Sequence, residues 1–242
     1  VIHHISELQA DARLMLAAQF LSRVEALLAD PAHRGSSNVK AAAALLSGEQ
    51  MSADVETLRQ RAAECAATLR HWDADDWILS QSVMGVTTSY KKDPNGSLWI
   101  KLHGVMDDVP VFDQMATVRE VDLYELWVPF CSQAYLLKHI GRVEVLSYLN
   151  AALPGLSRDC VLHAYACDCL LEDSCILIQG RSVGAWPGVE LPETKGWFAD
   201  RMDIHAFRAR IELLSPTRAS TSLQANIDPK APVPQALIDF LM

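Results

Sequence analysis

A serine flanked by two glycines is the first feature of this chain that could support chemistry. The run Gly180-Arg181-Ser182-Val183-Gly184 matches the Gly-x-Ser-x-Gly pattern, which places a hydrolase nucleophile on a sharp turn between a strand and a helix. Pro187 and Gly188 follow almost at once and oppose a helix. Asp203 and His205, the later acid and base, stand only two residues apart. We therefore interpret the segment as a strand that ends in a loop.

Sulfur ligands for a metal are a second possibility. Cys160, Cys167, Cys169 and Cys175 lie near His163, and thiolates and imidazole are ligands that zinc prefers. No Cys-x-x-Cys pair exists, so the pattern favours small core residues on strands. The sequence also lacks a phosphate-binding glycine loop and a dinucleotide fingerprint. We therefore expect no metal, no cofactor and no enzymatic activity.

Composition limits the partners and the compartment. Half of the 242 residues are apolar, and 21 Lys and Arg face 30 Asp and Glu, for a formal net charge of −9. This charge opposes binding to nucleic acid and to anionic bilayers, so any membrane contact should involve a neutral or zwitterionic surface. No apolar run approaches the ~20 residues that span a bilayer. Six cysteines are too few for a disulfide scaffold and indicate a reducing, cytoplasmic location.

The elements that must position these residues fall into two groups. Helical spacing of apolar residues predicts helices at 7–29, 39–46 and from Ser52 to about Leu69. After Trp72 the residues become β-like, with a helical crossover that begins at Pro110 and leads into 120–130. Strands are predicted at 77–92, 98–106, 143–150, 159–170, 175–183, 205–214 and 219–227, and a short helix after Pro234. Helices at the two ends of a run of strands predict an α+β fold with an antiparallel sheet.

Four short motifs follow one another in this second part. They are Glu120-Val121-Asp122-Leu123-Tyr124 leading to Trp127-Val128-Pro129, Pro154 with Ser157-Arg158-Asp159, Ser182-Val183, and Asp228-Pro229-Lys230 with Pro234, Ile238 and Asp239. In this order and spacing they resemble the START (steroidogenic acute regulatory protein-related lipid transfer) domain family. The resemblance covers about residues 52–242. We therefore divide the chain into an N-terminal helical extension, 1–50, and a START-like lipid-binding domain, 51–242.

The resemblance implies the helix-grip fold, in which a curved antiparallel sheet surrounds a C-terminal helix. It also implies non-catalytic binding and transfer, or sensing, of a single lipid such as a phospholipid or sterol in an internal apolar cavity. Sterol-binding members carry a basic residue where this chain has Ala164, and Arg181 on the next strand could substitute for it. Alternation in the last two strands gives one apolar face that alternates small and large side chains. The side chains expected around the ligand are Leu102, Met115, Tyr124, Trp127, Leu162, Ala164, Tyr165, Arg181, Phe207, Ala209, Ile211, Leu223, Ala225, Ile238 and Leu241.

Three further hypotheses accompany this one. The loop 184–198 carries Trp186, Trp197 and Phe198, which could touch a membrane or pack against the terminal helix. A helix-grip enzyme, a cyclase or hydrolase, could use His163, Tyr165 or Arg181 in the same cavity as acid, base or clamp. The extra N-terminal helices could instead dock a protein partner through an apolar stripe.

Overall fold

The computed structural model describes residues 2–33, 36–72, 76–93, 97–128, 130–153, 156–194 and 201–230. The chain divides into two compact units. The helical unit comprises Val1–Asp73 with Cys167–Asp173, and the sheet unit comprises Ala74–Ala166 with Ser174–Met242. The boundary expected after residue 50 falls inside a helix, Glu49–Arg70.

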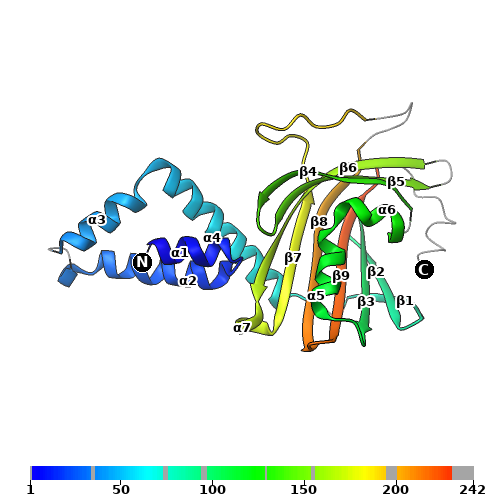
Figure 1. The fold of residues 1–242 in the computed structure, drawn as a ribbon, viewed down its shortest axis with the longest axis horizontal. Helices are drawn as coiled ribbons and strands as arrows, with labels where there is room; N and C mark the ends of the chain where they lie inside the picture. The colour runs from blue at the N-terminus through cyan, green and yellow to red at the C-terminus, as the bar shows by residue number, and fades with distance from the viewer. Residues whose placement is uncertain are drawn as a thin grey trace. The chain divides into compact units, whose positions relative to one another are not determined.

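The helical unit packs around buried apolar residues that belong to three of its four α-helices. Its elements are α1 (Ile2–Ala10), α2 (Leu14–Ala29), η1 (Pro31–His33), α3 (Ser37–Leu46) and α4 (Glu49–Arg70) (Figure 1). Leu14, Ala17, Leu21 and Val24 recur at helical spacing and are the buried residues of α2. The single helix expected over 7–29 was wrong, because Ala12 has a positive φ of 62° and interrupts it. Helix α4 begins at Glu49, before the start expected at Ser52.

A cluster of buried sulfur atoms lies in the helical unit. The Sγ atoms of Cys167 and Cys169 are 3.5 Å apart, and the Sγ atom of Cys169 is 3.8 Å from the Sδ atom of Met15. Hydrogen bonds from the thiols of Cys169 and Cys65 lower the pKa of Cys167. The six cysteines are free, and among the residues that the structure describes no group of His, Cys, Asp and Glu has the geometry to hold a metal ion.

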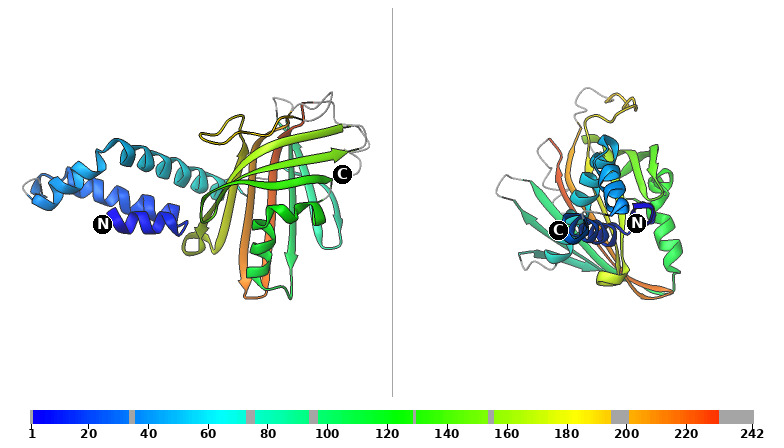
Figure 2. Two further views of the ribbon diagram at one scale, coloured as in Figure 1. Left: turned by 45° about the horizontal axis from the view of Figure 1, so that its top comes forward. Right: turned by 90° about the vertical axis from the view of Figure 1, so that its left-hand side faces the viewer.

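The sheet unit is a curved, open antiparallel sheet of nine strands in the order β1-β2-β3-β9-β8-β7-β6-β5-β4 (Figures 1 and 2). The strands are β1 (Ile78–Val83), β2 (Val86–Lys92), β3 (Leu98–Met106), β4 (Cys131–Gly141), β5 (Glu144–Leu153), β6 (Leu156–Cys169), β7 (Cys175–Ser182), β8 (Asp203–Ser215) and β9 (Arg218–Asp228). The predicted α+β class with an antiparallel sheet and N-terminal helices is confirmed. The helix expected after Pro234 lies outside the described residues.

Two strand assignments differ from the structure. The segment 77–92, expected to be one strand, forms β1 and β2 around a tight turn at Met84-Gly85. Strand β4 was not expected at all. The remaining strands lie within a few residues of their predicted ranges. The sheet therefore has two more strands than the sequence pattern revealed.

The crossover between β3 and β4 forms α5 (Val111–Arg119), η2 (Val121–Leu123) and α6 (Tyr124–Trp127), as predicted. Backbone bonds tie its start to the β8–β9 turn, since Val111 N–H donates to the carbonyl of Pro216 at 3.0 Å. Its end is held at the edge strand β4. There the carboxylates of Asp122 and Glu125 each accept a backbone N–H at 3.0 Å, from Leu136 and Ala134 respectively. The crossover thus provides acceptors for backbone N–H groups of the edge strand that would otherwise lack a hydrogen-bond partner within the sheet.

None of the described helices combines the length and the apolar composition needed to cross a membrane.

Candidate functional site

The residues of four neighbouring strands form one continuous apolar surface. The pairing of β7, β8, β9 and β3 aligns three rows across the sheet. The rows are Ile176, Ile211, Thr221, Gly104; then Ile178, Ala209, Leu223, Leu102; then Gly180, Phe207, Ala225, Ile100. We call this surface the apolar face. It collects six of the side chains expected around a ligand: Leu102, Phe207, Ala209, Ile211, Leu223 and Ala225.

Strand β6 extends the apolar face with two more expected residues. Leu162 and Ala164 belong to a buried cluster to which Phe207 is packed. A Cβ atom added at Gly180 would lie 3.2 Å from the Cβ atom of Ala164, so these two residues point the same way. Ala164 therefore places a buried methyl group on the same side of the sheet as the apolar face.

The apolar face is not fully covered. Ile211 is buried near the middle of the sheet at 1 % exposure, but Leu102 on β3 retains 37 %. Phe207 and Leu223 are half-buried. Each row also contains one or two small residues, so the surface is uneven. The apolar area that remains exposed is area from which a hydrocarbon ligand would exclude water.

Of the crossover residues expected to line the site, Tyr124 is fixed by polar contacts. Its hydroxyl donates to the carbonyl of Val118, and its ring packs edge-on against Trp127 at 5.2 Å between centroids. Burial, and to a lesser extent the nearby thiol of Cys131, raise the pKa of Tyr124 to about 12, so the phenol is neutral at pH 7. Trp127 remains 49 % exposed and Met115 is half-buried.

Tyr165 and Arg181 lie on the opposite face of the sheet. Tyr165 directly follows Ala164 on β6, and adjacent strand residues point to opposite faces. Arg181 directly follows Gly180 on β7 and is exposed. These two side chains therefore do not join the apolar face.

His163 also lies on that opposite face, and the loop after β7 covers it. Its Nε2 atom is 2.8 Å from the Oε1 atom of Glu144, and both side chains are largely buried. The ring of Trp186 lies against His163 with 4.6 Å between centroids. Trp186 is thus half-buried against the sheet. The terminal helix, against which this loop was expected to pack, lies outside the described residues. Trp197, Phe198, Ile238 and Leu241 lie outside the described residues.

Ser182, the serine of the Gly-x-Ser-x-Gly run, does not occupy a nucleophile turn. Its hydroxyl accepts the N–H of Ile204 at 3.0 Å, and between residues 183 and 194 no helix follows. The serine therefore joins the end of β7 to the start of β8, which agrees with the sequence interpretation.

A buried carboxylate near the start of β6 was not predicted. Asp159 is 4 % exposed, and its Oδ2 atom is 3.5 Å from the Nε atom of Arg201. Desolvation, followed by the charge of Asp159, raises the pKa of Tyr148 to about 12. Nothing in the sequence near Asp159 indicates a partner as distant as Arg201. The pair attaches the start of β8 to β6, on the face that carries His163.

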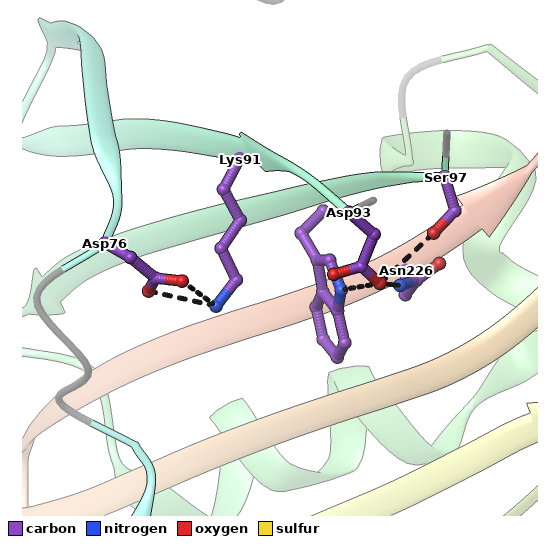
Figure 3. Close-up of polar contacts among 6 residues, drawn as sticks. Asp76, Lys91, Asp93, Ser97 and Asn226 are labelled. Atoms are coloured by element: carbon purple, nitrogen blue, oxygen red, sulfur yellow. Dashed lines mark hydrogen bonds and ion pairs between the residues drawn. The ribbon is translucent and has the colours of Figure 1, made fainter. Parts of the chain in front are cut away.

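The polar side chains at the β2–β3 turn form a closed network (Figure 3). One carboxylate oxygen of Asp93 accepts hydrogen bonds from Trp99 Nε1 at 3.0 Å, Asn226 Nδ2 at 3.0 Å and Ser97 Oγ at 3.3 Å. Trp99 and Asn226 are cross-strand partners on the face opposite the apolar one. This network joins three strands through side chains.

Lys91 occupies the neighbouring position on the same face. Its Nζ atom donates to both carboxylate oxygens of Asp76 at 3.0 Å, as Figure 3 shows, and lies 4.7 Å from the ring centre of Trp77. The hydrogen bond from Lys91 lowers the pKa of the exposed Asp76. These contacts stabilise the surface of the sheet, and they lie on the side away from the apolar face.

Solved structures share this architecture. Human STARD10 superimposes with a TM-score of 0.58 at 17 % identity, over 72 % of this chain and 70 % of that one. Human StAR-related lipid transfer protein 5 gives 0.58 at 18 % over 76 % and 87 %. A STAR-related lipid transfer protein fragment from Xanthomonas axonopodis gives 0.55 at 18 % over 69 % and 89 %. No family model and no curated protein matches the sequence. The chain therefore has a START-like fold, as the motifs predicted.

Proposed function

We propose that this protein binds a single lipid against its apolar face and transfers it between membranes, or reports its presence, without covalent chemistry. The observation that carries the proposal is the apolar face itself. It is a twelve-residue surface of four strands whose large members Leu102, Phe207 and Leu223 keep part of their apolar area exposed. The START-like fold of lipid transfer proteins supports the same interpretation.

The energetics favour recognition by shape. Burial of a methylene yields about 0.8 kcal/mol, so a chain of about sixteen carbons yields roughly 12 kcal/mol before the entropy of association is subtracted. None of the twelve residues of the apolar face carries a charge, and Ala164 supplies none on β6. We infer that apolar contact supplies most of the affinity and that polar groups select among head groups.

The geometry disfavours the enzymatic alternative. The three residues that could act as acid, base or clamp, His163, Tyr165 and Arg181, lie on the face away from the apolar one. His163 is moreover engaged by Glu144 and covered by Trp186. Catalysis by these groups on a ligand held at the apolar face would require a side chain to pass through the sheet.

The proposal includes a reducing cellular compartment for this protein. All six cysteines are free, and five of them are buried. This usage is consistent with a reducing environment such as the cytoplasm.

Uptake of labelled lipid tests the function. The delipidated 242-residue chain is incubated with vesicles that carry labelled phospholipid or sterol and is then separated from them. Native mass spectrometry measures the mass of the protein with any bound lipid. We expect one equivalent of one lipid class per chain. Failure to take up any class, from vesicles or from a cyclodextrin complex, would contradict the proposal.

A further inference from the structure

The tight turn between β1 and β2 carries a residue that local folding does not favour. Met84 and Gly85 form the two central positions, with φ of 51° and 80°, and Val83 pairs with Val86 across the turn. Two-residue turns with two positive φ values favour Asn-Gly, and a positive φ costs another L-residue roughly 1 kcal/mol. Met84 is 98 % exposed, so no contact compensates this cost.

Other apolar side chains surround Met84 at this end of the sheet. Val83 is 55 % exposed, Val86 44 %, Val105 41 % and Met106 38 %. All lie at the same end of the sheet, because Val83 pairs with Val86, Val86 pairs with Gly104, and Val105 and Met106 follow Gly104 on β3. Adjacent strand residues point to opposite faces, so Val105 lies on the face opposite Val86 and Met106. We call these five residues, Val83, Met84, Val86, Val105 and Met106, the apolar tip. Several large side chains exposed together at one end of a sheet mark an interaction surface.

The charge around the apolar tip restricts the partner. The stretch from Trp77 to Tyr90 contains no charged residue, and its polar groups are hydroxyls and an amide. Beyond Met106 come Asp107, which pairs with Arg218 at 2.6 Å, and the exposed Asp108. An uncharged tip bordered by the Asp107–Arg218 pair and by Asp108 carries no excess of positive charge, so it does not complement an anionic surface. It fits an apolar region covered by electrically neutral groups.

We propose that the apolar tip inserts into the interface of a zwitterionic phosphatidylcholine bilayer. Three residues of a strand span about 10 Å, which matches the ~5–10 Å to which interfacial elements bury their apolar side chains. Ser82 and Thr87, whose hydroxyl oxygens are 3.3 Å apart, then stand at head-group level. This surface differs from the tryptophan loop expected from the sequence, where Trp186 packs against His163.

The variant Met84→Asn separates insertion from folding. Asparagine tolerates a positive φ, so the variant keeps the turn and should unfold at a higher temperature than the wild type. It removes the apolar side chain, so its partition coefficient onto phosphatidylcholine vesicles should fall about tenfold. The matched control is Leu45→Asn, which removes an apolar side chain that is 59 % exposed on α3 and should leave partitioning unchanged.

Two results would overturn the proposal. One is a Met84→Asn variant that partitions like the wild type. The other is wild-type binding that requires phosphatidylserine and disappears at high salt, because insertion without charge is insensitive to both. Uptake of lipid from a cyclodextrin complex keeps this test separate from that of the proposed function. Met84→Asn should still take up lipid from the cyclodextrin complex. If the wild type took up no lipid from that complex, the result would contradict the proposed lipid binding but not the proposed membrane insertion of the apolar tip.

Discussion

The Nε atom of Arg158, at the start of β6, donates a 2.8 Å hydrogen bond to the carbonyl oxygen of Pro229, just beyond the end of β9. Strands β7 and β8 lie between these two strands in the sheet. The buried side chain therefore reaches past the ends of both and fixes the point where the chain leaves the apolar face. It joins the Arg-Asp and Asp-Pro-Lys motifs, which are far apart in the sequence.

Replacement of Arg158 by Met tests how much the hydrogen bond to Pro229 contributes to stability. The guanidinium also donates to the carbonyl of Ser157 at 2.9 Å, so the variant leaves two carbonyl oxygens without this donor. We expect the free energy of unfolding, measured in urea, to fall by about 2–4 kcal/mol. The exposed Arg181→Met is the control and should change it by about 0.5 kcal/mol or less. Equal effects of the two variants would show that the bond to Pro229 contributes nothing.

A bulky residue on the apolar face should obstruct the ligand. Thr221 and Ser220 are adjacent, half-buried residues of β9 that point to opposite faces, which makes Thr221→Phe and Ser220→Phe a matched pair. A phenyl ring on the apolar face displaces part of an acyl chain, and loss of two methylene contacts costs about 1.6 kcal/mol. Lipid affinity should fall about tenfold in Thr221→Phe and stay unchanged in Ser220→Phe. The reverse order would place the ligand on the other face.

His163 should contribute to the stability of the fold and not to lipid binding. Its replacement by Ala removes one hydrogen-bond partner of the largely buried Glu144 and the ring beneath Trp186. We expect a loss of about 1–3 kcal/mol in the free energy of unfolding, a change in tryptophan fluorescence, and unchanged lipid uptake. Replacement of the exposed His205 by Ala should alter none of the three. Abolished uptake in a folded His163→Ala variant would place the ligand near His163 and not on the apolar face.

Alternation revealed the apolar face because β8 and β9 keep a period of two over most of their length. Phe207, Ala209 and Ile211 on one strand and Leu223 and Ala225 on the next were therefore assigned to one surface, and the register confirms that they share it. The same alternation excludes Tyr165 and Arg181 from the apolar face, because each directly follows a residue that points to that face, Ala164 and Gly180 respectively. Grouping these polar residues with the apolar ones conflicted with a constraint that the sequence already contained.

Local irregularity explains the two strands that the sequence pattern did not reveal. The pairing of β4 with β5 shifts register at three places between Cys131 and Gly141, and each shift interrupts the alternation. At the β1–β2 turn, Met84 stands where Asn or Asp would signal a hairpin. The Asp159–Arg201 pair was missed for another reason, since no pattern near Asp159 encodes a contact with another strand.

Two tyrosines should make the fold sensitive to alkaline pH. Burial is the main cause that raises the pKa of both Tyr124 and Tyr148 from 10.0 to about 12. Between these values the unfolded chain releases protons that the folded chain retains. Stability is therefore unaffected by these groups below pH 10 and falls as pH rises toward 12, by up to about 1.4 kcal/mol per pH unit for each phenol.

Phenolate absorbance measured alongside urea unfolding checks this dependence. Tyr124→Phe and Tyr148→Phe should each lose one transition near pH 12 and show a shallower decline in stability above pH 10. Tyr148→Phe keeps the ring that stacks on Tyr135 at 4.9 Å, so its stability at neutral pH should change little beyond the loss of the hydroxyl contact. A wild-type decline in stability that is identical in both variants would show that other groups govern alkaline unfolding.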